Sequence, residues 1–319
     1  MDTLRIHLFG RLSIQWDGSR VFESLPPKAQ ELFVYLLLYR ERWHTRERLA
    51  AELWPEANPS DARSRLRRLM WRLQTGLSED TAARLLAVEG DWLSINSEVS
   101  LWLDVAVVEE TYRRLGMMTG GGLSPAQVAE LEGVTELIQG DLLDNWYQEW
   151  CVVERERLRI IQISILSHLV SHYVAVGEIE RGVAAASRLL QIDRAHEGAH
   201  RQLMRLRYMA GDRTGALRQF AICTQVLDEE FSVAPERPTL ALYDEIRREL
   251  PGVDTHLPAM RPPEIIANRV SIETIHSRLD QLQKVIIESQ ARVSRELYTL
   301  HTAIRSHPAE DHRHEHDNS

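Results

Sequence analysis

The chain has 319 residues, of which 44% are hydrophobic and 27% charged, a composition typical of a globular protein of two or three domains. No run approaches the roughly 20 apolar residues that span a membrane, and the start MDTLRIHLFG lacks the apolar core of a secretory signal. The two cysteines, Cys151 and Cys223, stand apart without CxxC spacing, which predicts a cytoplasmic protein without disulfides or a structural zinc site.

The net charge of −9 is unevenly distributed along the chain. Residues 1–100 contain 14 Lys and Arg against 14 Asp and Glu, whereas the rest contains 24 against 33. Because local charge decides whether a surface can approach phosphate, a neutral first segment is compatible with nucleic-acid binding although the chain is acidic.

The first third of the chain alternates between strand and helix patterns. LRIHLFG and LSIQWDG alternate apolar and polar residues and predict two strands, and SRVFES is a third short candidate. Pro27 then begins a helix, KAQELFVYLLLYRE, and Thr45 is the expected N-cap of a second helix, RERLAAELW.

Residues 61–77, DARSRLRRLMWRLQTGL, form the third predicted helix, with five arginines, one acid and Ser60 or Asp61 as its cap. Its leucines recur three or four residues apart and form one apolar stripe: Leu66, Leu69, Leu73 and Leu77. The opposite side carries Ser64, Arg68, Trp71, Arg72 and Thr75, flanked by Arg65 and Arg67. This pattern favours a DNA recognition helix; the alternative is a solvated basic face on an ordinary helix.

LLAVEGDWLSIN follows and predicts a hairpin around residues 89–91. Strands, three helices and a hairpin, in that order, are the elements of a winged helix, in which the second and third helices form the helix-turn-helix and the hairpin is the wing. The predicted fold class is mainly α with a small N-terminal β component.

These segments resemble the OmpR-type winged helix of the SARP family of bacterial transcription activators. The residues that match the family pattern are Lys28, Leu32, Arg46, Glu47, Leu49, Leu53, Trp54, Pro55, Ala62, Arg63, Leu66 and Arg67. Arg65 and Trp71 depart from it. The resemblance implies a DNA-binding domain over residues 1–97 that recognises double-stranded promoter DNA and a regulator that contacts RNA polymerase.

Residues 98–250 are helical in pattern. Gly177 and Gly211 are 34 residues apart, and small residues, Gly182 and Ala216, follow each five positions later, which is the tetratricopeptide period. A generic helical bundle is the alternative. The segment resembles the bacterial transcriptional activator domain of SARP regulators at Gly140, Asp141, Leu142, Leu143, Trp150, Glu154, Arg155, Arg157 and Leu158. The resemblance implies an interaction domain.

Within the third helix, we expect Arg68 and Arg72, with Ser64 and Trp71, to approach base edges. We expect Arg63, Arg65 and Arg67 to bind phosphates. Thr75 lies with Arg68 and Arg72 on the side opposite the leucines and belongs to the same predicted DNA-binding surface.

No residue pattern favours an enzyme or a bound cofactor. GxxxxGK[ST], GxSxG, HExxH and paired-carboxylate motifs are absent from the sequence. His168 and His172, like His196 and His200, are four residues apart and could place two imidazoles side by side. Surface or capping histidines are the alternative, and we expect no metal.

The last part of the chain has three predicted segments: a proline-rich linker (251–263), a coiled-coil helix (264–306) and a disordered, histidine-rich tail (307–319). The apolar stripe of the coil consists of Ile272, Ile275, Leu279, Leu282, Ile286, Val293, Leu297, Leu300 and Ile304. We expect this stripe to form a homodimer, with folding back onto the middle domain as the alternative.

The function predicted from these elements is sequence-specific DNA binding that regulates transcription. A helical-repeat scaffold whose winged helix contacts proteins instead of DNA is the alternative; its exposed third helix would be less basic than residues 61–77.

Overall fold

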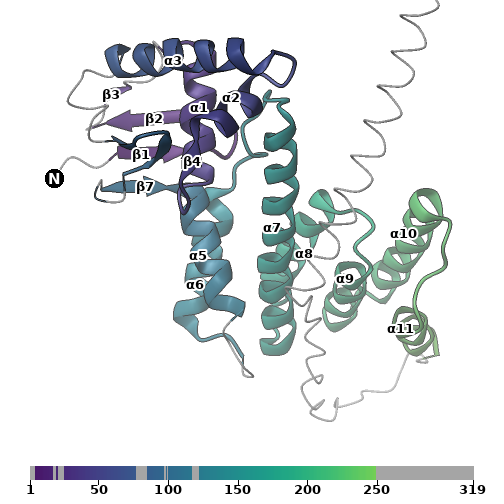
Figure 1. Ribbon diagram of the computed structural model, residues 1–319. Helices are drawn as coiled ribbons and strands as arrows, with labels where there is room; N and C mark the ends of the chain where they lie inside the picture. The colour runs from purple at the N-terminus through teal and green to yellow at the C-terminus, as the bar shows by residue number, and fades with distance from the viewer. Residues whose placement is uncertain are drawn as a thin grey trace, which may run out of the picture. The chain divides into compact units, whose positions relative to one another are not determined.

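The computed structural model describes residues 4–16, 19–20, 25–76, 85–96, 98, 100–116 and 122–248. The predicted linker, coiled coil, dimerisation stripe and tail lie outside the described residues. Within the described part, two small sheets and three helices precede a run of seven further helices (Figure 1).

The first sheet has four strands in the order β3-β2-β1-β7. Its strands are β1 (Leu4–His7), β2 (Ser13–Trp16), β3 (Ser19–Arg20) and β7 (Leu101–Leu103). β2 pairs antiparallel with β1, with Leu4 opposite Trp16, and Leu4 and Ile6 turn inward to the core. The two predicted strands are confirmed. β7, which pairs parallel with β1, was not predicted, because the pattern of residues 98–250 indicated only helix.

Three helices follow β3 in the chain: α1 (Pro27–Leu38), α2 (Arg46–Leu53) and α3 (Pro59–Gly76). α1 is buried along most of its length and supports the other two. Thr45 caps α2 as predicted, accepting the Arg48 N–H at 3.2 Å. A second sheet of order β4-β6-β5 closes this part of the chain, formed by β4 (His44–Thr45), β5 (Leu86–Glu89) and β6 (Trp92–Ile95). The predicted hairpin is therefore confirmed, and β4 adds a third strand to it.

The remaining helices are α5 (Asp104–Gly116), α6 (Pro125–Leu137), α7 (Glu149–Val176), α8 (Ile179–Ile192), α9 (Glu197–Met209), α10 (Arg213–Phe231) and α11 (Arg237–Arg248). Each packs on the next from α7 onward, and α7 also touches α9. Gly177 ends α7 and Gly211 follows α9, both with positive φ (76° and 79°), so the 34-residue spacing marks two equivalent turns.

α7 is long and apolar enough, by length and composition alone, to cross a membrane. Its apolar side chains instead pack on protein: Leu158, Ile161 and Ile165 are buried, and the helix contacts α5, α6, α8 and α9. It also carries Arg155 and Arg157 in its first half, where they bond to backbone carbonyls and carboxylates. α7 is thus the central helix of the helical part.

The winged-helix part and the helical part share one hydrophobic core, which runs from Leu4 to Tyr173. Asp104, the first residue of α5, is fully buried. Its carboxylate accepts N–H bonds from Leu8 at 2.7 Å, Phe9 at 3.0 Å and Val105 at 2.7 Å. Burial raises the pKa of the Asp104 carboxyl, and the three N–H donors oppose this shift. One carboxylate therefore caps α5 and fixes the end of β1.

A turn after α6 binds residues 8–10, the segment that follows β1. The Gly10 N–H donates to the Asp141 carbonyl at 2.7 Å, and the Leu143 N–H donates to the Leu8 carbonyl at 2.8 Å. Arg155 fixes this turn by donating to the carbonyls of Leu142, Leu143 and Trp146. Residues 8–10 are thus enclosed by the helical part.

We predict that Asp104→Ala lowers the free energy of unfolding by about 2–4 kcal/mol, because each buried N–H left without an acceptor costs about 1–3 kcal/mol. Asp104→Asn keeps one acceptor oxygen and should lie between the wild type and Asp104→Ala. Urea denaturation followed by circular dichroism measures the difference. Equal stability of the three proteins would contradict the role assigned to this carboxylate.

Close packing of α8 on α9 depends on the absence of a side chain at Gly182. A Cβ there would lie 2.8 Å from the nearest carbon of Leu206, which is fully buried, and 3.2 Å from Tyr173 Cβ. We predict that Gly182→Ala destabilises the protein by about 1–3 kcal/mol through overpacking.

The matched control is Gly133→Ala in α6, where an added Cβ meets no atom within 4 Å. There alanine should stabilise the helix by about 0.5–1 kcal/mol. The midpoints of urea unfolding of both variants check the pair, and a loss at position 133 equal to that at 182 would refute the packing explanation.

Candidate nucleic-acid interface

α3 begins at a cap formed by Asn58. Its side-chain oxygen accepts the Asp61 N–H at 2.9 Å and the Ser60 hydroxyl at 2.8 Å. Pro59 follows at the first helical position, where its missing N–H costs nothing. The expected cap, Ser60 or Asp61, was wrong, because both residues lie inside the helix and bond to Asn58.

The inner side of α3 fixes the helix on the protein. Leu66, Leu69 and Leu73 are buried as predicted, and Ala62 and Met70 join them. α3 makes its main contacts with α2 and α1. Leu77 lies outside the described residues.

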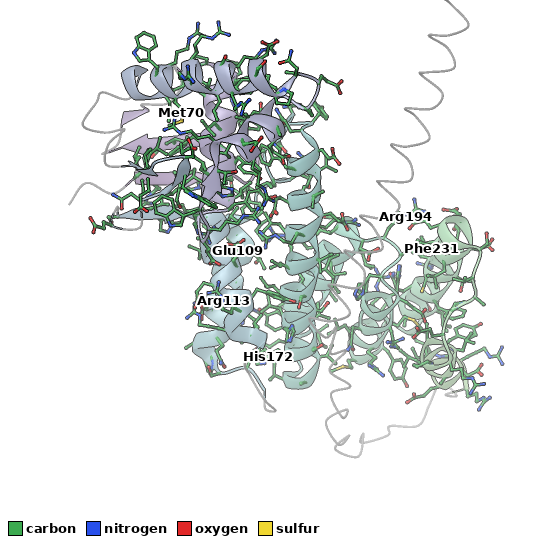
Figure 2. The ribbon with its side chains drawn as sticks, in the orientation of Figure 1. Met70, Glu109, Arg113, His172, Arg194 and Phe231 are labelled. Carbon is green, nitrogen blue, oxygen red and sulfur yellow. The ribbon has the colours of Figure 1, made fainter. Side chains whose placement is uncertain are left out.

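The outer side of α3 faces solvent and is strongly basic. Its exposed side chains are those of Arg63, Ser64, Arg65, Arg67, Arg68, Trp71 and Arg72. Figure 2 shows side chains projecting from this outer side of α3. Trp71 is 64% exposed, an unusual value for a residue that proteins normally bury. Thr75 lies in the last turn, and its side chain is outside the described residues.

Most of these arginines are not neutralised within the protein. Among the described residues, no carboxylate lies within ion-pair distance of Arg63, Arg65, Arg67 or Arg68. The one acid of the helix, Asp61, is in the first turn and accepts from the Asn58 amide at 2.9 Å. Arg63, Arg65, Arg67 and Arg68 therefore carry positive charge that no carboxylate of the described residues pairs with.

The wing (residues 85–96) differs in charge from α3. It contains no Lys or Arg; its tip exposes the carboxylates of Glu89 and Asp91, and Trp92 is 48% exposed. The Arg46 N–H donates to the Asp91 carbonyl at 2.8 Å, which ties the wing to the start of α2. The wing itself therefore adds no positive charge to the surface of α3.

The turn between α2 and α3 encloses a hollow of about 360 Å³, lined by Leu53, Trp54, Pro55, Glu56, Ala57 and Arg65. Lys28 supports the turn by donating to the Leu53 carbonyl at 2.9 Å and lying over the Trp54 ring. Arg65 is therefore placed between the outer side of α3 and this turn. Helical spacing alone could not show this, since it depends on the path of the chain before α3.

Comparisons with known proteins place the helical part in a family. The sequence profile of the bacterial transcriptional activator domain matches residues 103–247. The helical part is thus similar to a bacterial transcriptional activator domain, and we refer to it as the activator domain. With the winged-helix-like region before it, this confirms the predicted resemblance to SARP-family regulators. Among curated proteins, none matches.

A solved structure shares the fold. Mycobacterium tuberculosis EmbR, determined in complex with a low-affinity phosphopeptide, superposes with a TM-score of 0.63 at 19% sequence identity. The match covers 79% of this chain and 67% of the EmbR chain. At this identity the likeness concerns the fold.

The histidines of the activator domain do not form a metal centre within the described residues, where no group of three or more potential ligands is found. His196 caps α9, accepting the Ala199 N–H at 3.0 Å. His200 is buried, with Gln219 at 2.6 Å and the Arg194 carbonyl at 2.8 Å. His168 bonds to the Ser164 carbonyl at 2.8 Å. Three of the four thus have identified structural bonds.

Proposed function

We propose that this chain is a sequence-specific DNA-binding regulator of transcription that binds double-stranded promoter DNA through the outer side of α3. The supporting observation is that Arg63, Arg65, Arg67 and Arg68 are exposed with no described carboxylate within ion-pair distance, next to an activator domain. An α-helix of 18 residues is about 27 Å long, sufficient to lie along a major groove about 12 Å wide.

The order of residues around α3 divides the interface into base and phosphate contacts. Ser64, Arg68 and Trp71 lie farthest from the buried leucines and would enter the groove; Arg72 borders them. Arg67 and Arg63 lie on one flank and Arg65 on the other, so they would reach the two phosphate backbones and set the register. The N-terminus of α3 carries the positive end of the helix dipole, which also favours binding of a phosphate there.

The activating role would come from protein contacts. The α2–α3 turn, with its hollow beside Arg65, is a surface on which RNA polymerase could bind while α3 lies in the groove. Association into a cytoplasmic homodimer through the predicted stripe at residues 272–304 remains part of this proposal.

A second candidate function is a helical-repeat scaffold whose winged helix contacts proteins. The acidic wing tip and the exposed Trp92 favour it. DNA binding and its salt dependence separate the two candidates, because a protein-contact surface gives no phosphate-dependent slope.

We predict that binding to its selected DNA site weakens linearly with the logarithm of salt concentration. At about −0.9 per neutralised phosphate, about three contacts per protomer give a slope near −5 for a dimer and near −3 for a monomer. Selection from a random duplex library supplies the site, and gel-shift titrations at several salt concentrations supply the slope. A flat response would reject the interface on α3.

We predict different effects for two arginines of α3. Arg68→Ala should relax the sequence preference and cost about 1–3 kcal/mol on the selected site, because an arginine on a guanine edge carries discrimination. Arg67→Ala should weaken all sequences alike and reduce the salt slope by about one contact.

Arg218→Ala, on the exposed side of α10, is the charge-matched control and should bind as the wild type does. The selection repeated with each variant reports both affinity and sequence preference. If all three variants behaved alike, the assignment of base and phosphate roles would be wrong.

A further inference from the structure

Trp71 is an apolar side chain on an otherwise polar surface. The exposed residues that surround it on the outer side of α3 are polar or charged: Ser64, Arg67, Arg68 and Arg72. The indole is nevertheless 64% exposed, while the leucines of the inner side attach the helix to the protein. α3 therefore does not use Trp71 for its own packing, and a partner that covered the ring would gain the free energy of burying it.

Trp71 lies on the part of α3 that points away from the core. Seven residues are close to two helical turns, so Trp71 follows Ser64 along the same line of the helix, and Arg68 is its neighbour three residues earlier. Three residues advance about 4.5 Å along an α-helix, and one base pair advances about 3.4 Å along DNA. With α3 in the groove and Arg68 on a base edge, the indole thus lies over the next base pair or the one after it.

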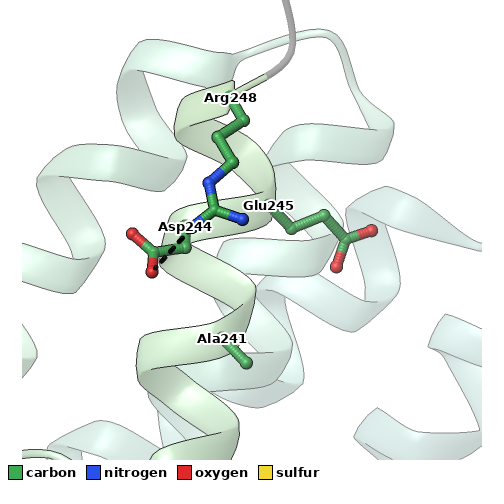
Figure 3. Close-up of a pocket in the computed structure, with 4 residues that line it drawn as sticks. All are labelled: Ala241, Asp244, Glu245 and Arg248. Atoms are coloured by element: carbon green, nitrogen blue, oxygen red, sulfur yellow. Dashed lines mark ion pairs between the residues drawn. The ribbon is translucent and has the colours of Figure 1, made fainter.

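The arginines beside Trp71 are available to phosphate. Arg67 and Arg68 have no carboxylate of the described residues within ion-pair distance. Arg248 of α11 shows the opposite arrangement: it pairs with Asp244 at 3.6 Å beside a hollow of about 570 Å³ that Glu245 also lines (Figure 3). Attraction between phosphate and the arginines of α3 would therefore bring the indole to the DNA.

Thymine is the base whose edge in the major groove suits an indole. All four bases present hydrogen-bonding atoms in that groove, and thymine adds a C5-methyl group. An indole over the polar atoms would remove water from them and offer a single N–H donor in return, which costs free energy. Over a methyl group, the ring and the methyl are both removed from water, which is favourable.

We propose that Trp71 recognises the methyl group of a thymine, so that the DNA site carries a thymine one or two base pairs from the guanine contacted by Arg68. This inference rests on the proposed binding of DNA by α3. It names a base that the side chain of Trp71 selects by shape and apolar contact, where Arg68 selects by hydrogen bonds. Insertion of the ring between base pairs is a different mode of binding, and it would not depend on the methyl group.

The test removes the methyl group from the DNA. Each thymine of the selected site is replaced in turn by deoxyuridine, which lacks only the C5-methyl group, and binding of the full chain is measured by fluorescence anisotropy. One replacement, at the distance from the guanine given above, should weaken binding about fourfold, as expected for burial of one methyl-sized group. Trp71→Ala should bind the thymine and deoxyuridine sites alike, whereas Trp71→Phe should keep the difference.

Phe231→Ala is the matched control, because Phe231 is an aromatic residue of similar exposure, 61%, at the end of α10. It should keep both the affinity and the difference between the two sites. Trp71→Ala should keep the salt dependence of the wild type, which shows that its α3 still binds the backbone of the site.

Equal affinity of the wild type for every deoxyuridine site would overturn the proposal. A loss that persisted in Trp71→Ala would also overturn it, since another residue would then contact the methyl group. Weaker binding by Trp71→Ala without any effect of deoxyuridine would indicate insertion between base pairs instead. In these three outcomes the wild type still binds its site, so the proposed DNA binding stands; failure to select any site would reject both.

Discussion

The buried carboxylate of Asp104 is the constraint on which the arrangement of the molecule depends. Its charge is removed from water and is tolerated because three backbone N–H groups converge on it, two from the end of β1 and one from α5. The same bonds determine where the winged-helix part sits on the activator domain. Since β7 adds its strand to β1 immediately before Asp104, the chain cannot leave the first sheet without passing through this joint.

Ion pairs near Asp104 also link the winged-helix part to the activator domain. Glu109 of α5 is held between Arg40, at the end of α1, and Arg157 of α7, and Arg157 also bonds to the buried Glu154. Replacing Glu109 would leave the partly buried Arg40 guanidinium without a carboxylate partner among the described residues. Because α1 also supports α3, the direction of the basic surface is linked through α1 to helices of the activator domain. A change in the packing of α5 or α7 therefore has a physical route to α3.

The sequence was sufficient to predict the structure wherever a local pattern of residues determined it. The leucines of α3 and the arginines opposite them needed only the helical repeat, and the turn at Gly177 needed only a residue able to adopt positive φ. It was insufficient where distant segments meet. β7 has three residues and exists because β1 offers an open edge, and Asn58 displaces Ser60 as the cap through the path of the α2–α3 turn.

Positive and negative charges lie on different elements of the winged-helix part. On α3 the arginines are concentrated on one side and the sole acid is tied to the cap, whereas the wing tip carries carboxylates and the chain as a whole is acidic. A polyanion would be attracted by the arginines of α3 and repelled by the carboxylates of the wing tip. Residues 85–96 contain no Lys or Arg. Trp71 lies beside Arg68 on the outer side of α3 and is exposed. Its indole is the largest apolar side chain that this side of the helix presents to a binding partner.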